Sequence, residues 1–203
     1  MTVYEVDGFT PVIGEGSFID ETASVIGNVC IGRNCYIAPG VRIRGDFGRI
    51  EIGDGTSVAD NAVVHARAGE ITRIGNQVTI SHCCVLDTCT VMDFAIIGIG
   101  SIVSNWAVVN KWAVVAEGAL IRNGFEVPEE RIAVGVPARL LDVAVSEGYK
   151  QDWRHFKDVY LQLAQDTYPR TMRKIEWTYK PPTRIPEAVS AVGAEGHEKR
   201  GCS

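Results

Sequence analysis

The stretch "IGIGSIVSNWAVVNKWAVVAEGALI", residues 97–121, decides the fold because an aliphatic residue returns at every sixth position. These positions hold Ile97, Val103, Val109, Val115 and Ile121, and a small residue stands four places after each of the first four. A period of six fits neither the 3.6-residue period of an α-helix nor the two-residue period of one long strand. It favours short strands joined by tight corners, in which large and small side chains alternately fill a narrow core.

The same repeat covers most of the first hundred residues. The repeating aliphatic positions are Ile13, Ile19, Val25, Ile31, Ile37, Ile43, Ile52, Val58, Val64, Ile74, Ile80, Leu86 and Met92. The spacing is interrupted after Ile43, again across "ARAGEITR" (66–73), and by one residue after Met92. Small residues are expected inward at Ala23, Cys35, Val41, Thr56, Ala62, Val78, Cys84, Ser101, Ala107, Ala113 and Ala119. The sequence therefore predicts a mainly β protein built as a parallel β-helix of six-residue repeats.

The pattern changes after Ile121. The segment "SEGYKQDWRHFKDVYLQLAQDTY", residues 146–168, places its aromatic residues at three- and four-residue steps, which predicts an amphipathic helix that ends at Pro169. We expect this helix to pack on the outside of the coils and to contact Trp106 and Trp112. The expected organisation is a β-helix over 8–140, the C-terminal helix over 141–176 and a flexible, Pro/Gly/Ala-rich tail over 177–203.

Composition limits the classes of partner. The net charge of −5 and pI near 5.4 argue against nucleic acid and against anionic membrane surfaces. We see no basic, apolar leader at the N-terminus and no apolar run long enough to span a bilayer. The six cysteines form no CxxC pair, so we expect reduced thiols and a cytoplasmic protein.

The repeat also positions two histidines and an aspartate. His65 follows Val64 and Asp87 follows Leu86, so both hold the same place in their hexads. They are 22 residues apart, and removing the four residues inserted after Val64 leaves three hexads, which is one coil. His65 and Asp87 are therefore expected to be stacked neighbours on one outward face.

His82 occupies a different place, two residues after Ile80, and is expected at another edge of the prism. The three side chains should not converge within one chain. A threefold axis parallel to the coils would bring His82 of one subunit to His65 and Asp87 of the next.

Four segments carry a resemblance to a known family: "VRIRGDFGRIEIG" (41–53), "VADNAVVH" (58–65), "ISHCCVLD" (80–87) and "GVPARLL" (135–141). In order and spacing they resemble the gamma-class carbonic anhydrase-like superfamily of hexapeptide-repeat proteins, over about residues 8 to 175. The most similar branch is the one associated with carnitine and phenylacetate catabolism. The resemblance implies a left-handed β-helix and a homotrimer with one divalent metal at each subunit interface, Zn²⁺ or else Fe, Co or Mn.

The resemblance also implies site residues. The metal ligands would be His65, His82 and Asp87, where Asp87 stands in place of the family's third histidine. Asp at this position can serve as a ligand, or the site can have lost its metal.

Further site residues follow from the same resemblance. The candidate catalytic residues are Arg44, Asp46, Asp60 and Glu70. Arg44 and Asp46 belong to an Arg-Gly-Asp element, and Glu70 is either a proton shuttle or a solvated loop carboxylate. The family's Asn-x-Gln-Asp element is Ser57–Asp60 here, so Ala59 replaces its glutamine.

The favoured function is a metal-dependent lyase (hydratase) or hydrolase that activates water and acts on a small molecule. Two alternatives are a hydrolase of coenzyme A thioesters in a carnitine or aromatic catabolic pathway and a non-catalytic accessory trimer. Ala59 and Asp87 keep the accessory alternative open. A hexapeptide acyltransferase is less favoured, because no hexad of the C-terminal coils carries a histidine.

Overall fold

The computed structural model describes residues 2–175, and its elements belong to the unit formed by Met1–Met172. The strands stack in three parallel ladders, and each ladder forms one flat face of a solenoid. The predicted flexible tail, residues 177–203, lies outside the described part, so that prediction is not tested. No helix among the described residues has the length and hydrophobicity needed to cross a bilayer.

The first ladder, called here the open face, comprises β1 (Thr2–Tyr4), the first halves of β4 (Ser24–Ile31) and β6 (Arg42–Ile52), β8 (Val63–His65), β11 (Val85–Asp87), β14 (Ile102–Val103) and β17 (Leu120–Ile121). The charged face comprises β2 (Val12–Ile13), the second halves of β4 and β6, β9 (Ile71–Ile74), β12 (Thr90–Val91), β15 (Val108–Val109) and β18 (Glu126–Val127).

The third ladder, called the helix face, comprises β3 (Phe18–Ile19), β5 (Tyr36–Ile37), β7 (Ser57–Val58), β10 (Thr79–Ile80), β13 (Ile96–Ile97), β16 (Val114–Val115) and β19 (Arg131–Val134). A last strand, β20 (Arg139–Ala144), pairs antiparallel with β19. The protein is thus a left-handed parallel β-helix with a C-terminal helix outside it, as predicted.

The core lies inside the prism and follows the six-residue repeat. Every predicted small inward position is buried, from Ala23 to Ala119. Among the large positions Ile13 and Ile19 are partly buried, and Met92 is 44% exposed while Val91 is buried in its place. The one-residue slip in the repeat therefore falls between Leu86 and Val91, one hexad earlier than predicted.

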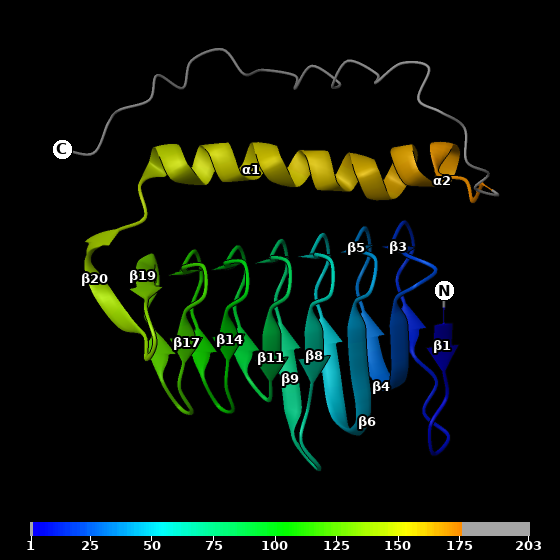
Figure 1. Ribbon diagram of the computed structural model, residues 1–203, viewed down its shortest axis with the longest axis horizontal. Coiled ribbons are helices and arrows are strands. Elements are labelled where there is room, and N and C mark those ends of the chain that lie inside the picture. The colour runs from blue at the N-terminus through cyan, green and yellow to red at the C-terminus, as the bar shows by residue number, and fades with distance from the viewer. Residues whose placement is uncertain (1, 176–203) are drawn as a thin grey trace, which may run out of the picture. The chain divides into compact units, whose positions relative to one another are not determined.

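The C-terminal helix runs along the stacked coils (Figure 1). It consists of α1 (Glu147–Gln162), a π-helical turn η1 (Leu163–Thr167) and α2 (Tyr168–Thr171). The Ser146 hydroxyl caps α1 by accepting a hydrogen bond from the backbone N–H of Tyr149, at 3.1 Å. The predicted end at Pro169 is wrong by two residues, because Pro169 lies in the first turn of α2, where a missing N–H is tolerated.

Polar and aromatic contacts fix α1 on the helix face. Trp153 Nε1 donates to Thr79 Oγ1 at 3.2 Å, and Lys157 Nζ donates to Ser57 Oγ at 2.9 Å. The prediction for Trp112 is confirmed, since the Arg154 guanidinium lies 4.9 Å from its ring centroid. The prediction for Trp106 is wrong: its side chain is half exposed and lies under the guanidinium of Arg67.

Candidate metal centre

His65 and Asp87 end the neighbouring strands β8 and β11 and pair in register, as predicted from counting hexads. His65 Nδ1 lies 3.4 Å from Asp87 Oδ2. Arg44 of β6 pairs with His65 on the other side, so the three residues form one column at an edge of the open face.

The His65 imidazole is mostly buried and its second nitrogen is unpaired. Its Nε2 is buried without a hydrogen-bond partner, and the nearest carboxylate oxygen, Asp46 Oδ1, lies 3.7 Å away, beyond hydrogen-bond range. Arg44 holds Asp46 through a 2.5 Å contact between its guanidinium and Oδ2. Burial alone would raise the pKa of Asp46, but the hydrogen bond and charge of Arg44 outweigh it and hold that pKa below its usual value.

His82 lies at the opposite edge of the open face, on the corner that joins β10 to β11. Its Nδ1 lies 3.0 Å from Asp60 Oδ2, and the side chain is about half exposed. Backbone hydrogen bonds stack this corner on those of the adjacent coils: Cys83 N–H donates to the Asp60 carbonyl, and Gly100 N–H donates to the His82 carbonyl.

One chain therefore brings His65, Asp87, Arg44 and Asp46 together, and separately His82 and Asp60. Within the described residues, no group of three His, Cys, Asp or Glu side chains is arranged to hold a metal ion. The two clusters lie on the two edges of the same face, because β11 begins just after His82 and ends at Asp87.

The donor atoms of the two clusters are of the kinds that bind a divalent metal. In both imidazoles Nδ1 faces a carboxylate, which leaves Nε2 available, and metal-binding histidines typically donate their other N–H to such a carboxylate. The Asp87 carboxylate makes two contacts. Its Oδ1 accepts a hydrogen bond from Thr88 Oγ1 at 2.8 Å, and its Oδ2 faces Nδ1 of His65. The side chains fit Zn²⁺ and similar ions in their chemistry, provided that a second chain supplies the missing half.

Glu70 lies exposed on the loop between β8 and β9. With Asp46, it lines a hollow of about 250 Å³ that also includes Phe9 and Phe47. Both carboxylates were predicted as candidate catalytic residues, and both line this one hollow.

A second hollow, of about 270 Å³, lies beside His82 and was not predicted from the sequence. It is lined by Thr79, Ser81, His82, Ile99, Glu117, Trp153, Phe156 and Tyr160. A signal for it exists in the repeat, because Asp60, His82, Ile99 and Glu117 each stand two residues after an inward aliphatic residue.

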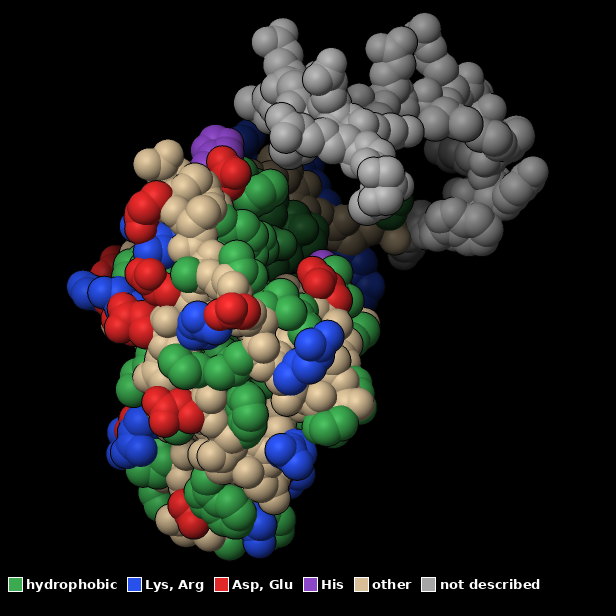
Figure 2. Space-filling model, turned by 90° about the vertical axis from the view of Figure 1, so that its left-hand side faces the viewer, with side chains coloured by type: hydrophobic (Ala, Val, Ile, Leu, Met, Phe, Trp, Pro, Cys, Tyr) green, Lys and Arg blue, Asp and Glu red, His purple; other side chains and the backbone are tan. Residues whose placement is uncertain are grey.

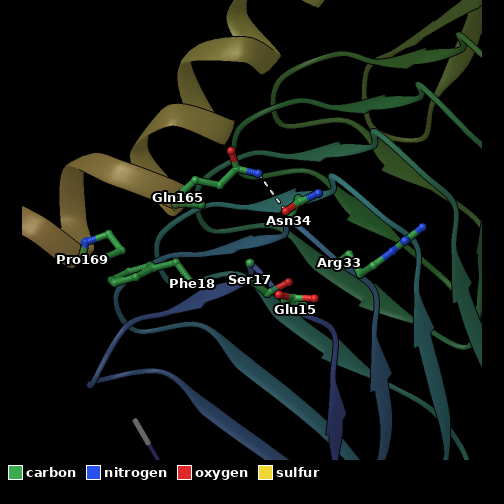
Figure 3. Close-up of a pocket in the computed structure, with 9 residues that line it drawn as sticks. Glu15, Ser17, Phe18, Arg33, Asn34, Gln165 and Pro169 are labelled. Carbon is green, nitrogen blue, oxygen red and sulfur yellow. Dashed lines mark hydrogen bonds between the residues drawn. The ribbon is translucent and has the colours of Figure 1, made fainter.

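A third hollow, of about 480 Å³, lies where the end of the helix meets the first coils (Figure 3). Gln165 Nε2 donates to Asn34 Oδ1 at 2.7 Å across it, and Arg33 is paired with Asp54 at 2.8 Å. Its described lining residues include no histidine or cysteine, so it is no candidate for the metal.

Comparison with known sequences agrees with the architecture. A family model described as "Bacterial transferase hexapeptide (six repeats)" matches residues 10–45. The mitochondrial gamma carbonic anhydrase 1 of Arabidopsis thaliana is 38% identical over 87 residues, which are 40% of this chain and 32% of that protein. The carnitine operon protein CaiE of Escherichia coli is 32% identical over 82 residues, 40% of this chain and 42% of CaiE. The matches thus span less than half the length of these curated relatives.

Solved structures match over much more of the chain. A hexapeptide transferase family protein from Anaplasma phagocytophilum is 36% identical with a TM-score of 0.76, and the match covers 80% of this chain and 96% of that one. A putative acetyltransferase from Bacillus cereus is 26% identical with a TM-score of 0.78, over 81% and 95% of the two chains. With its coils, its repeat and these relatives, the chain belongs to the hexapeptide-repeat family.

Proposed function

We propose that the protein is a metal-dependent enzyme of the gamma-carbonic anhydrase-like type, a lyase (hydratase) or hydrolase that acts at the subunit interfaces of a homotrimer. The observation that carries the proposal is the shared geometry of the two histidines. Each imidazole directs Nδ1 toward a carboxylate, and Nε2 of His65 is buried without a partner. An unpaired buried nitrogen costs free energy, which a ligand to it would offset.

The three faces of the solenoid support a trimer. The helix face is covered by α1, and the charged face carries ion pairs of Glu51 with Arg49 and Arg73. The open face presents an outward apolar column of Val63, Val85, Ile102 and Leu120, which the register aligns. A threefold axis in front of that face would pack the apolar columns of three subunits against one another. It would also bring the His82 edge of one subunit to the His65 edge of the next.

In this assembly His65 and Asp87 of one subunit and His82 of its neighbour would hold the metal. The metal would supply Lewis acidity toward water or a substrate carbonyl. Asp60 orients the His82 imidazole, Asp87 would turn from Nδ1 of His65 to the metal, and Arg44 keeps Asp46 ionised beside His65. Exchange of a neutral imidazole for the Asp87 carboxylate lowers the positive charge of the site, and Ala59 cannot position water as a glutamine would. Both changes favour a substrate other than carbon dioxide.

The test is the metal content per subunit, measured by elemental mass spectrometry on untagged protein purified without chelators. We expect about one divalent ion per subunit, lost in His65→Ala and in His82→Ala, while both variants stay folded because neither imidazole belongs to the core. His155→Ala, an exposed histidine of α1, is the matched control and should keep the metal. Wild-type protein that takes up no metal on reconstitution contradicts the proposal and leaves the accessory trimer as the better reading.

Acyl transfer is the second candidate, supported by the likeness to a hexapeptide transferase family protein and to a putative acetyltransferase. Release of coenzyme A from an acyl thioester distinguishes the two. Release that stops on chelation and needs no acceptor amine or alcohol supports metal-dependent hydrolysis. Release that needs an acceptor and survives chelation supports the transferase.

A further inference from the structure

The hollow beside His82 lies between the solenoid and the C-terminal helix. One wall is formed by His82, Ile99 and Glu117, which stand on stacked corners joined by backbone hydrogen bonds from coil to coil. The other wall is α1. Seen from the β19–β20 end, hydrophobic side chains gather in a recess between the helix and the coils (Figure 2). The hollow has a volume of about 270 Å³, enough for a small organic group.

The helix wall is aromatic. Trp153, Phe156 and Tyr160 line the hollow, and the ring of Tyr149 stacks on that of Trp153 with centroids 5.6 Å apart. Trp153 is fixed by its hydrogen bond to Thr79, whereas the Phe156 side chain is 55% exposed. A row of rings with one large ring left half open offers π faces to a ligand at a site that is already formed.

The charge around the hollow is negative. Glu117 lines it and Asp60 stands at the next corner, and among its described lining residues there is no Lys or Arg. Two tyrosines are affected by this negative charge. Burial and, to a smaller extent, the charge of Glu117 raise the pKa of Tyr149, and burial and, to a smaller extent, the charge of Asp60 raise the pKa of Tyr160. An anionic ligand group would be repelled here and a cationic one attracted.

The positive side chains of α1 near this region are engaged elsewhere. Lys150 contacts Glu130 and Glu147, Lys157 donates to Ser57 and to the Val78 carbonyl, and Arg154 lies over Trp112. Among the described residues of α1, no Lys or Arg side chain forms an ion pair with Glu117, so its charge is not compensated by the helix.

We propose that this hollow binds a methylated ammonium group of the substrate, such as a trimethylammonium. Such a group has no N–H to donate, and it is recognised by aromatic faces together with a carboxylate. This assignment rests on the proposed function. The hollow would hold the cationic end of the substrate, and the reacting end of the same substrate would lie at His82. The substrate class is thus a small quaternary-ammonium compound with an ester, thioester or hydratable group.

The test compares choline with its neutral isostere 3,3-dimethyl-1-butanol, by calorimetric titration or ligand-observed NMR on the metal-stripped full chain. The two probes have the same shape and differ in charge, so their ratio isolates the cationic contribution. We expect choline to bind about tenfold more tightly, the size of a partly desolvated cation–π and carboxylate contact. Equal binding of the two probes, tighter binding of the neutral one, or no saturable binding of choline overturns the proposal.

Variants locate the binding. Glu117→Gln and Phe156→Leu should each reduce the preference for choline several-fold, whereas Glu129→Gln, an exposed glutamate outside the hollow, should leave it unchanged. An unchanged preference in both hollow variants would place the binding elsewhere and overturn the assignment. The metal content of the same samples separates the two proposals: metal without choline preference removes only this one, and choline preference without metal removes only the metal-dependent enzyme.

Discussion

Lys157 is a buried amine that joins the helix to the coils. Its Nζ donates to Ser57 Oγ at 2.9 Å and to the Val78 carbonyl at 2.8 Å, and no carboxylate is among these partners. Burial lowers the pKa of the Lys157 amine to about 7. Between pH 7 and the usual lysine pKa near 10.5, the unfolded chain therefore binds a proton that the folded chain does not.

The folding free energy should depend on pH accordingly. Because the unfolded state binds more protons, stability rises with pH across this window, by up to about 1.4 kcal/mol per pH unit from this group. The cost of burying the charge is present in full below pH 7 and is relieved above it. Lys157→Met should remove this rise, and urea unfolding between pH 7 and 8.5 measures it.

The matched control is Lys150→Met. Hydrogen bonds that Lys150 donates to Glu130 and Glu147 raise its pKa, so its contribution is constant over the same window. The measurements stop at pH 8.5 because burial also raises the pKa of the Cys35 and Cys84 thiols. At higher pH these thiols ionise in the unfolded chain before they ionise in the folded one, which lowers the stability of the folded state. An equal slope in wild type and Lys157→Met would contradict the buried, neutral amine.

Single positions differ in how far the sequence predicts them. The pairing of His65 with Asp87 follows from counting, since the repeat fixes which residues share a face. The contacts of Asp46 and Asp60 with the imidazoles do not follow, because they depend on side-chain rotamers that the repeat leaves free. Glu117 was missed although it shares the hexad position of His82, because its role depends on a helix that starts thirty residues later in the chain.

The first turn of α1 is stabilised by two side-chain contacts. Ser146 accepts the backbone N–H of Tyr149, and Glu147 pairs with Lys150 in the same turn. Ser146→Ala should lower stability by about 1 kcal/mol, which is roughly 2–4 °C in melting temperature for a chain of this size. Ser146→Asp retains a capping oxygen and should melt close to wild type in the same thermal scan; a loss as large as that of alanine would argue against the cap.

The sequence predicts this helix but not its π turn. The three- and four-residue steps of the aromatic residues identify the face that packs on the coils. The η1 turn inserts one extra residue per turn between Leu163 and Thr167, and it allows Tyr168 to reach Tyr36 and Phe18, with ring centroids 5.7 and 5.2 Å apart. The π turn depends on tertiary packing against the first coils, so the spacing of the aromatic residues alone does not predict it.

Assembly of the whole protein should depend on the open face. Ile102 stands in the middle of its apolar column and is 42% exposed in the single chain. Ile102→Asp would bury three carboxylates near one axis in the trimer, so we expect monomers by light scattering and loss of interfacial metal.

Val12→Asp provides the control for assembly. Val12 is 62% exposed on the charged face, which the proposed trimer leaves in solvent. This variant should stay trimeric and keep its metal. Dissociation of the Val12 variant but not of the Ile102 variant would move the interface to the charged face.

The antiparallel pairing of β20 with β19 has a consequence for growth of the assembly. A parallel solenoid ends in a coil whose backbone groups can template another coil, so an open end can propagate into filaments. On the helix face β20 reverses direction and occupies that edge, and its chain then turns away into α1. The protein thereby blocks the addition of a further parallel strand to β19, so growth of the ladder on the helix face stops at β20.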